Sequence, residues 1–205
     1  MEYRLEMIRR VLHPDFGMGW NAALALVPLA MAVALFRPRW RRGIFWWLGV
    51  IVFCLFLPNS AYTLTDVLHL VNHIRREPHL PVWSVALVLI PQYALFMMAG
   101  WQAHVLSLMR CGDYLKAIGR ERLVFPCEIA LTLLVSLGVY LGRFQRFNSW
   151  DVISQPERLA LTTIDNFTRR HPLEAMAATF GVLCVLYYAT KIVDRALIEY
   201  GERRW

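Results

Sequence analysis

Long apolar runs alternate with short polar links along the chain, and this pattern predicts helices that cross a membrane. The five runs are Trp20–Phe36, Gly43–Leu57, Val82–Met109, Leu123–Gly142 and Leu173–Ile192. A helix needs about 20 residues to cross the roughly 30 Å of bilayer hydrocarbon. The last three runs meet that length, and the first reaches it when Phe16–Gly19 are added. We therefore expect an all-α fold, an integral membrane helical bundle of about five transmembrane helices.

The second run is the exception, because a helix over its length spans only about 22 Å. Pro58-Asn59 follows it, and the chain continues as the half-apolar stretch SAYTLTDVLHLV. We predict that the second helix breaks at Pro58-Asn59 and restarts as a short helix. Irregular backbone at such a depth persists only where protein or water surrounds it, so the break is the first place to look for a site.

The pattern divides the chain into three regions. Residues 1–19 bring charges before any long apolar run, and their apolar residues share a helical face, which predicts an interfacial segment. Residues 20–192 form the predicted transmembrane helical bundle, and residues 193–205 a basic cytoplasmic tail. The stretch PERLALTTIDNF is typical of a further short helix that lies flat on the membrane, because its apolar residues lie along one face.

Composition supports the membrane class. The chain is 58% apolar and 18% charged, whereas soluble domains are about 45–50% apolar and about 25% charged. Its four cysteines show no zinc-binding spacing. We therefore expect buried structural thiols, with no metal site and no disulfide framework.

The net charge of +7 is concentrated between the apolar runs. Basic clusters follow the first, third and fifth runs, which places those segments in the cytoplasm by the positive-inside rule. Pro58–Pro81 and Arg143–Pro172 are then extracytoplasmic, although the second of these links also carries five arginines. We expect a multi-pass protein of the bacterial inner (plasma) membrane. Membrane lipids with anionic headgroups are the expected partners, and nucleic acid is not.

The first candidate site is PNSAYTLTDVLHLVNH, residues 58–73, which follows the predicted break. In a helix, Tyr62, Asp66, His69 and His73 would project from one face. Asp66 and His69 are candidate catalytic residues, since a carboxylate three residues before a histidine can fix the imidazole tautomer. Together with His73 they could instead offer three ligands to a zinc-like ion. A structural interpretation also stands, in which Asn59 or its neighbour caps a helix.

The second candidate site is YLGRFQRFNSWD, residues 140–151, at the same predicted membrane face. Arginines there can bind a phosphate or carboxylate with two hydrogen bonds. The candidate substrate-binding residues of the two segments are Asn59, Tyr62, Arg143, Arg146, Asn148 and Asp151. The structural alternative is that Asp66 pairs with Arg143 or Arg146 only to hold helices together, because buried charges in membranes are usually paired.

Two further expectations concern the opposite membrane face. Glu128 lies about one turn inside the fourth run, and His104 lies near the same level on the third. We predict a structural hydrogen bond between these two side chains. Cys111 is expected in a basic loop after the third run.

The segments FLPNSAYTLTDVLHL and YLGRFQRFNSWD, with Trp20-Asn21 before them, resemble a bacterial membrane family catalogued as domain of unknown function 1361. The resemblance runs from about Trp20 to Ala189. It implies a multi-span inner-membrane protein and no established activity. Two departures are that a charged stretch stands where relatives have another apolar span, and that Ser60-Ala61 replaces Ala-Pro in the first motif.

Three functions are compatible with these residues. The first is an enzyme that binds a lipid-linked or anionic small substrate through its arginines, with Asp66 and His69 as the acid–base pair. The second is a small transporter component with a solute near the broken helix. The third is a structural or accessory protein in which the polar cluster only ties helices together.

Overall fold

The computed structural model describes residues 16–38, 42–147, 149, 151–168 and 170–204, and every regular element within these ranges is helical. The elements are α2 (Phe16–Leu35), α3 (Ile44–Tyr62), η1 (Thr63–Asp66), α4 (Val67–Arg76), α5 (Val82–Ser84), η2 (Val85–Leu89), α6 (Ile90–Ala117), η3 (Glu121–Leu123), α7 (Val124–Phe144), α8 (Asp151–Ser154), α9 (Pro156–Thr168) and α10 (Arg170–Glu202). Here η2 is a π-helical stretch, and η1 and η3 are 3₁₀ helices.

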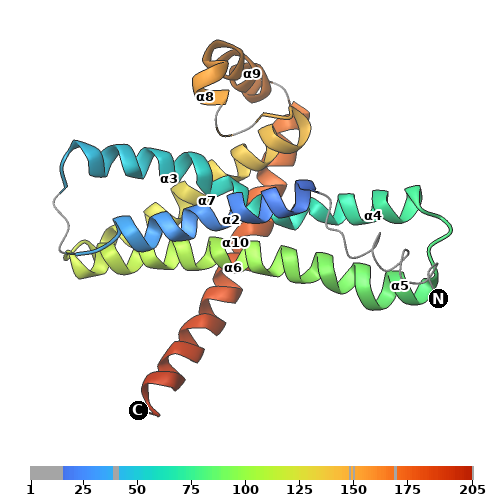
Figure 1. Ribbon diagram of the computed structural model, residues 1–205. Helices are drawn as coiled ribbons and strands as arrows, with labels where there is room; N and C mark the ends of the chain where they lie inside the picture. Colours follow the sequence, from blue (N-terminus) through green and yellow to red (C-terminus); the bar gives the residue numbers. More distant parts are fainter. Residues whose placement is uncertain (1–15, 39–41, 148, 150, 169, 205) are drawn as a thin grey trace.

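Five helical stretches are long and apolar enough to cross a membrane: Met18–Leu35, Ile44–Arg76, Val82–Ala117, Glu121–Phe144 and His171–Glu202. The predicted all-α bundle of about five membrane helices is therefore confirmed. In Figure 1, α2, α3, α6 and α7 run alongside one another, whereas α10 crosses them and the short α8 and α9 lie at the end of the bundle where α7 ends and α10 begins.

The core lies between α3, α6 and α7. Phe53 and Leu57 from α3 meet Val105 and Leu108 from α6 and Val135 from α7, and each side chain is almost fully buried. Between lipid-exposed helices, such interlocked packing supplies much of the association energy, because lipid tails are as apolar as the side chains themselves.

The second helix does not break at Pro58-Asn59. Helix α3 continues through Pro58 to Tyr62, and the geometry changes only at η1. The Pro58 ring packs directly against Gly138 of α7, where an added Cβ would approach the Pro58 Cγ to 2.5 Å. The site segment is thus attached to a continuous helix, and its irregular turn lies one turn later than the sequence suggested.

Side-chain hydroxyls explain why the turn tightens at η1. The Thr63 hydroxyl donates to the Ser60 carbonyl at 2.8 Å, and the Thr65 hydroxyl donates to the Tyr62 carbonyl at 2.6 Å. Such bonds to carbonyls three residues back compete with the regular helical pattern. Helix α6 makes room for η1 at Gly100, where a Cβ would lie 2.4 Å from the Thr63 hydroxyl.

The ends of the chain differ from the expected regions. Most of the N-terminal segment, residues 1–15, lies outside the described residues, and Phe16–Gly19 begin α2. Residues 193–202 of the predicted tail continue α10 without interruption. The helix expected at PERLALTTIDNF is present as α9, while its orientation on a membrane stays a prediction.

Candidate functional site

Asp66 is the centre of the candidate site. It is the last residue of η1 and is 3% exposed. Its Oδ1 lies 3.0 Å from the His69 Nδ1 and 3.1 Å from the Arg143 Nη2. The one-turn spacing of Asp66 and His69 brings their side chains together, and α7 supplies the cation. The predicted Asp66–His69 pair is thus in contact, and so is the Asp66–Arg143 pair of the structural alternative.

Arg143 binds more than the carboxylate. Its Nη2 donates to the Thr65 hydroxyl at 2.7 Å and also to the Thr65 carbonyl, while its Nε donates to the same hydroxyl at 3.1 Å. Its guanidinium carbon lies 4.8 Å from the centre of the Tyr62 ring. Arg143 therefore holds η1 against the end of α7 and gives the Thr65 carbonyl a side-chain partner in addition to the backbone N–H of Val67.

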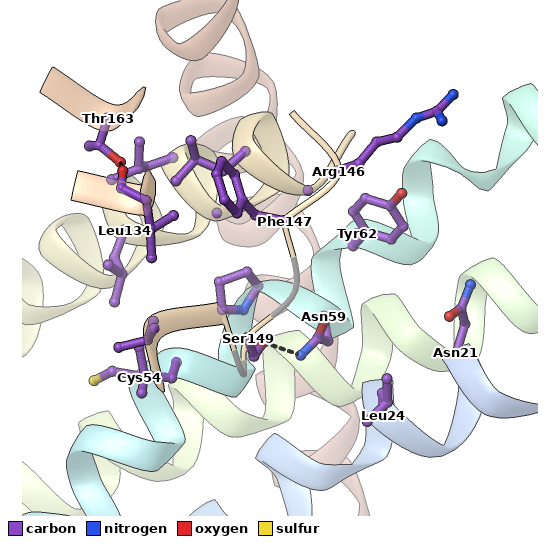
Figure 2. Close-up of a pocket in the computed structure, with 18 of the residues that line it drawn as sticks. Asn21, Leu24, Cys54, Asn59, Tyr62, Leu134, Arg146, Phe147, Ser149 and Thr163 are labelled. Carbon is purple, nitrogen blue, oxygen red and sulfur yellow. Dashed lines mark hydrogen bonds between the residues drawn. The ribbon is translucent and has the colours of Figure 1, made fainter. Parts of the chain in front are cut away.

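A cavity of about 590 Å³ adjoins this cluster. Helices α2, α3 and α7 line it together with the segment that follows α7 and with α8 and α9 (Figure 2). Its apolar lining comes from Leu24, Cys54, Leu55, Leu134, Leu137 and Leu141, and its polar lining from Asn21, Asn59, Tyr62, His69, Arg146, Ser149 and Thr163. We call this space the α3–α7 cavity.

The α3–α7 cavity changes character along the helices that form it. Cys54 and Leu134 lie near one end, about 12 Å of helix away from Tyr62 on α3 and Gly142 on α7. The polar residues Asn59 and Tyr62 follow on α3, and His69 lies further along α4. The cavity therefore has an apolar end and a polar end, and the polar end reaches the Asp66 cluster.

Two glycines of α7 allow this arrangement. Gly138 faces Pro58, and Gly142 faces the Tyr62 ring, which a Cβ would approach to 3.3 Å. Both pairs are four residues apart on their helices, so α3 and α7 run in parallel and in register. Gly138 and Gly142 form a GxxxG pattern, a recognised signal of close helix packing in membranes. The sequence contained this signal, but the predictions did not use it.

Arg146 lines the polar end in an unusual backbone conformation. Its φ is 58°, in the left-handed region where glycine usually ends a helix. The turn it makes lets the Phe147 N–H donate to the Leu141 carbonyl at 3.2 Å. The side chain is exposed and points outward beside Tyr62 in Figure 2. Arg146 makes no ion pair or hydrogen bond within the described part of the chain.

The remaining candidates are distributed more widely. The Asn59 Nδ2 donates to the Ser149 hydroxyl at 2.9 Å and so ties α3 to the segment after α7 (Figure 2). Asp151 is buried at the start of α8 and accepts a hydrogen bond from the Ser154 hydroxyl at 2.9 Å. Asn148 lies outside the described residues.

His73 does not join the cluster as a ligand. Its ring faces the Tyr93 ring edge-on, with the centroids 6.4 Å apart. Among the described residues, no three His, Cys, Asp or Glu side chains converge closely enough to hold a metal ion. The arrangement around Asp66 thus suits hydrogen bonding and proton transfer.

The predicted His104–Glu128 hydrogen bond is wrong. His104 is completely buried and stacks on Trp101, and neither ring nitrogen has a hydrogen-bond partner among the described residues. Glu128 instead accepts hydrogen bonds from the Tyr187 hydroxyl at 2.8 Å and from the Lys191 Nζ at 2.5 Å. We call this the Glu128 cluster; the Tyr188 hydroxyl completes it at 3.3 Å.

Cys111 is also placed differently from the prediction. Helix α6 continues through it to Ala117, so Cys111 is a buried helical residue and not part of a loop. Its Sγ lies 3.9 Å from the Cys127 Sγ on α7. Asp113 of α6 is in contact with Arg195 of α10, so a charged pair joins these two helices near this end.

The comparisons with known proteins give a family and no activity. A family model described as "Protein of unknown function (DUF1361)" matches residues 20–185. No curated protein and no solved structure matches the chain.

Proposed function

Because this chain belongs to the DUF1361 family, whose function is unknown, we propose from the geometry of its cavity that it binds an amphiphile with an anionic headgroup, a lipid or lipid-linked molecule. The observation that carries the proposal is the α3–α7 cavity, which has an apolar end, a polar end and a fixed histidine at the polar end. Binding sites of this kind combine an apolar lining with a few polar groups that orient the ligand.

The apolar end supports binding of a hydrocarbon tail. Leu55, Leu134 and Leu137 line it from α3 and α7, and Leu134 is also partly exposed on the outer surface of the bundle. Burying each methylene of a lipid tail is worth about 0.8 kcal/mol in water. A tail that moves in from the bilayer gains little from hydrophobicity, so selection must come from the headgroup.

The polar end supports binding of an anion. Arg146 brings a cation without a protein partner among the described residues, and its left-handed backbone costs about 1 kcal/mol relative to glycine. A non-glycine residue held in that conformation suggests that its side chain has a use. A phosphate headgroup at the mouth of the cavity would pair with the guanidinium through two hydrogen bonds.

The Asp66–His69 pair supports acid–base chemistry on that headgroup. With the Nδ1 proton donated to Asp66, the His69 Nε2 is an acceptor, and His69 lines the α3–α7 cavity. The Nε2 would take the proton of a water or hydroxyl that attacks the headgroup phosphorus. It would then return that proton to the oxygen that is released when the phosphoester P–O bond breaks. Asp66 would stabilise the intervening imidazolium, as a buried carboxylate does in hydrolytic triads, and Arg143 holds Asp66 in place. By the distribution of basic links, this site faces the extracytoplasmic side of the bacterial inner membrane.

The structural alternative has its own support. The bonds from Arg143 to Thr65 and Asp66 join α7 to η1 whether or not a ligand binds. Transport has less support, because Phe53, Val105 and Val135 fill the space between α3, α6 and α7.

Native mass spectrometry of protein released from nanodiscs tests the binding proposal. The discs contain equal amounts of phosphatidylglycerol and phosphatidylcholine. We expect the wild-type protein to retain phosphatidylglycerol preferentially, and Arg146→Gln to reduce that preference about tenfold, as loss of one charge-assisted contact predicts. Arg110→Gln is the matched control, because Arg110 is an exposed arginine of α6 away from the cavity.

A second pair of variants tests where the tail lies. Leu55→Trp fills the apolar end and should reduce retention of either lipid, whereas Val52→Trp, on the exposed side of the same helix, should not. Equal lipid retention by wild-type protein, Arg146→Gln and Leu55→Trp would refute the proposal.

A further inference from the structure

A second cavity, of about 660 Å³, lies between the end of α7, α9 and the start of α10. It is lined by Tyr140, Gln145, Thr162, Asp165, Asn166, His171 and Pro172. All of these side chains except that of Pro172 carry a polar group, in contrast to the mainly apolar lining of the α3–α7 cavity. We call this space the α9–α10 cavity.

Asn166 marks the α9–α10 cavity as a binding site. The residue is 4% exposed, and its Nδ2 has no hydrogen-bond partner among the described residues. A buried amide donor that stays unpaired is costly, and native proteins rarely retain one without a reason. Since Asn166 lines the cavity, a ligand with an acceptor oxygen would remove that cost.

The other lining groups indicate what kind of ligand would fit. The Tyr140 and Thr162 hydroxyls and the side-chain amide of Gln145 make no hydrogen bond within the described part of the chain. Each can both donate and accept, as a sugar hydroxyl requires of its partners. These hydrogen-bonding groups carry no charge, which favours an uncharged ligand, and His171 stands at the rim, where its side chain is 97% exposed.

Helix α9 separates the two cavities. Thr162 lines the α9–α10 cavity, whereas the next residue, Thr163, lines the α3–α7 cavity. We propose that the α9–α10 cavity binds an uncharged polyhydroxyl group, a sugar or polyol, with Asn166 as its buried hydrogen-bond donor. This site is separate from the proposed lipid site, and neither depends on the other.

Saturation-transfer difference NMR tests the proposal with full-length protein in phosphatidylcholine nanodiscs. The probes are maltose, N-acetylglucosamine and myo-inositol at millimolar concentration. We expect saturation transfer to at least one of them. Asn166→Leu should weaken that binding about tenfold or more, as loss of a buried hydrogen bond predicts. Leu161→Ala is the control, since Leu161 is an exposed residue of α9 that lines neither cavity.

Thermal unfolding separates a binding site from a packing defect. If Asn166 serves a ligand, the bound probe raises the midpoint of the wild-type protein and not that of Asn166→Leu. Thr162→Val provides a second test should Asn166→Leu fail to fold, and it should also weaken binding. The proposal is overturned if no probe gives saturation transfer, or if Asn166→Leu binds as well as wild type and only unfolds at a higher temperature. Either result leaves the phosphatidylglycerol measurement on the α3–α7 cavity unaffected.

Discussion

Asp66 and Glu128 are two acids with the same burial and different surroundings. Each is 3% exposed, and each is paired with a cation from another helix. Glu128 is bound by Lys191 and by two tyrosine hydroxyls, all from α10. Asp66 is bound by Arg143 from one side and by His69 from the other, and the His69 side chain is 52% exposed.

The difference lies in where each network ends. The donors to Glu128 all come from α10 and none of them lines the α3–α7 cavity, so the Glu128 cluster ties α7 to α10. The Asp66 cluster continues through the imidazole of His69 into the α3–α7 cavity. The two acids are equally buried, so burial alone does not distinguish the two networks, whereas the 52% exposure of the His69 side chain and its place in the α3–α7 cavity do.

The largest expected effect on the free energy of unfolding comes from removing Lys191 from the Glu128 cluster. Lys191→Met leaves the Glu128 carboxylate buried without its cation, and removing one partner of a buried pair typically costs about 3–5 kcal/mol. We expect a value near the lower end, because Lys191 is partly exposed and the tyrosines remain. Unfolding in mixed micelles by increasing amounts of dodecyl sulfate measures the change. Combining Lys191→Met with Glu128→Gln should recover most of the stability; a single-variant loss under about 1 kcal/mol would contradict a structural role.

An intermediate effect is expected where Asp66 and Arg143 meet. Asp66→Asn and Arg143→Gln should each cost about 1–3 kcal/mol, because each leaves hydrogen-bonding groups of its partner unmet. The double variant should cost less than the sum by about 0.5–3 kcal/mol, since both changes break one network. The same unfolding measurement, applied as a double-mutant cycle, gives this difference. Strict additivity would mean that the two residues do not act together.

The smallest effect on stability is expected at His69, the exposed partner of Asp66. His69→Gln should change the free energy of unfolding by less than about 0.5 kcal/mol, as exposed substitutions usually do.

In the wild-type protein, bound phosphatidylglycerol should slow the modification of His69 by diethyl pyrocarbonate. It should leave His171 unaffected, since that histidine lies on the far side of α9 from the lipid. Equal protection of both histidines would contradict a ligand at His69.

The sequence predicted the Asp66 cluster because its parts are local or fixed by counting helices. Asp66 and His69 meet through the spacing of a single turn. Arg143 was placed at the same end because α3 and α7 cross in the same direction. The sequence could not provide the Thr65 carbonyl as a partner, since a backbone carbonyl has no sequence signature and its contact with Arg143 depends on how η1 packs against α7.

The Glu128 cluster could not be predicted in the same way. Its cation, Lys191, lies 63 residues away on a helix that crosses the bundle, and the rotation of that helix sets which residues face α7. Counting helices gives only a rough level for a residue, and not its direction. Glu128 lies beside Gly112 of α6, where an added Cβ would be 3.3 Å from the Glu128 Oε1, whereas His104 lies eight residues earlier, about 12 Å along the helix, and stacks on Trp101.

The continuity of α3 through Pro58 sets the height at which the Asp66 cluster stands. From Ile44 to Asp66 the helix rises about 33 Å, close to the roughly 30 Å thickness of bilayer hydrocarbon. If α3 begins at one boundary of the hydrocarbon, the His69 imidazole lies level with the ester carbonyls of the opposite leaflet. Bilayer thickness would then regulate access of water to His69, through the same mismatch forces that tilt membrane helices. A thin membrane would leave the ring in water, and a thick one would draw it among the acyl chains.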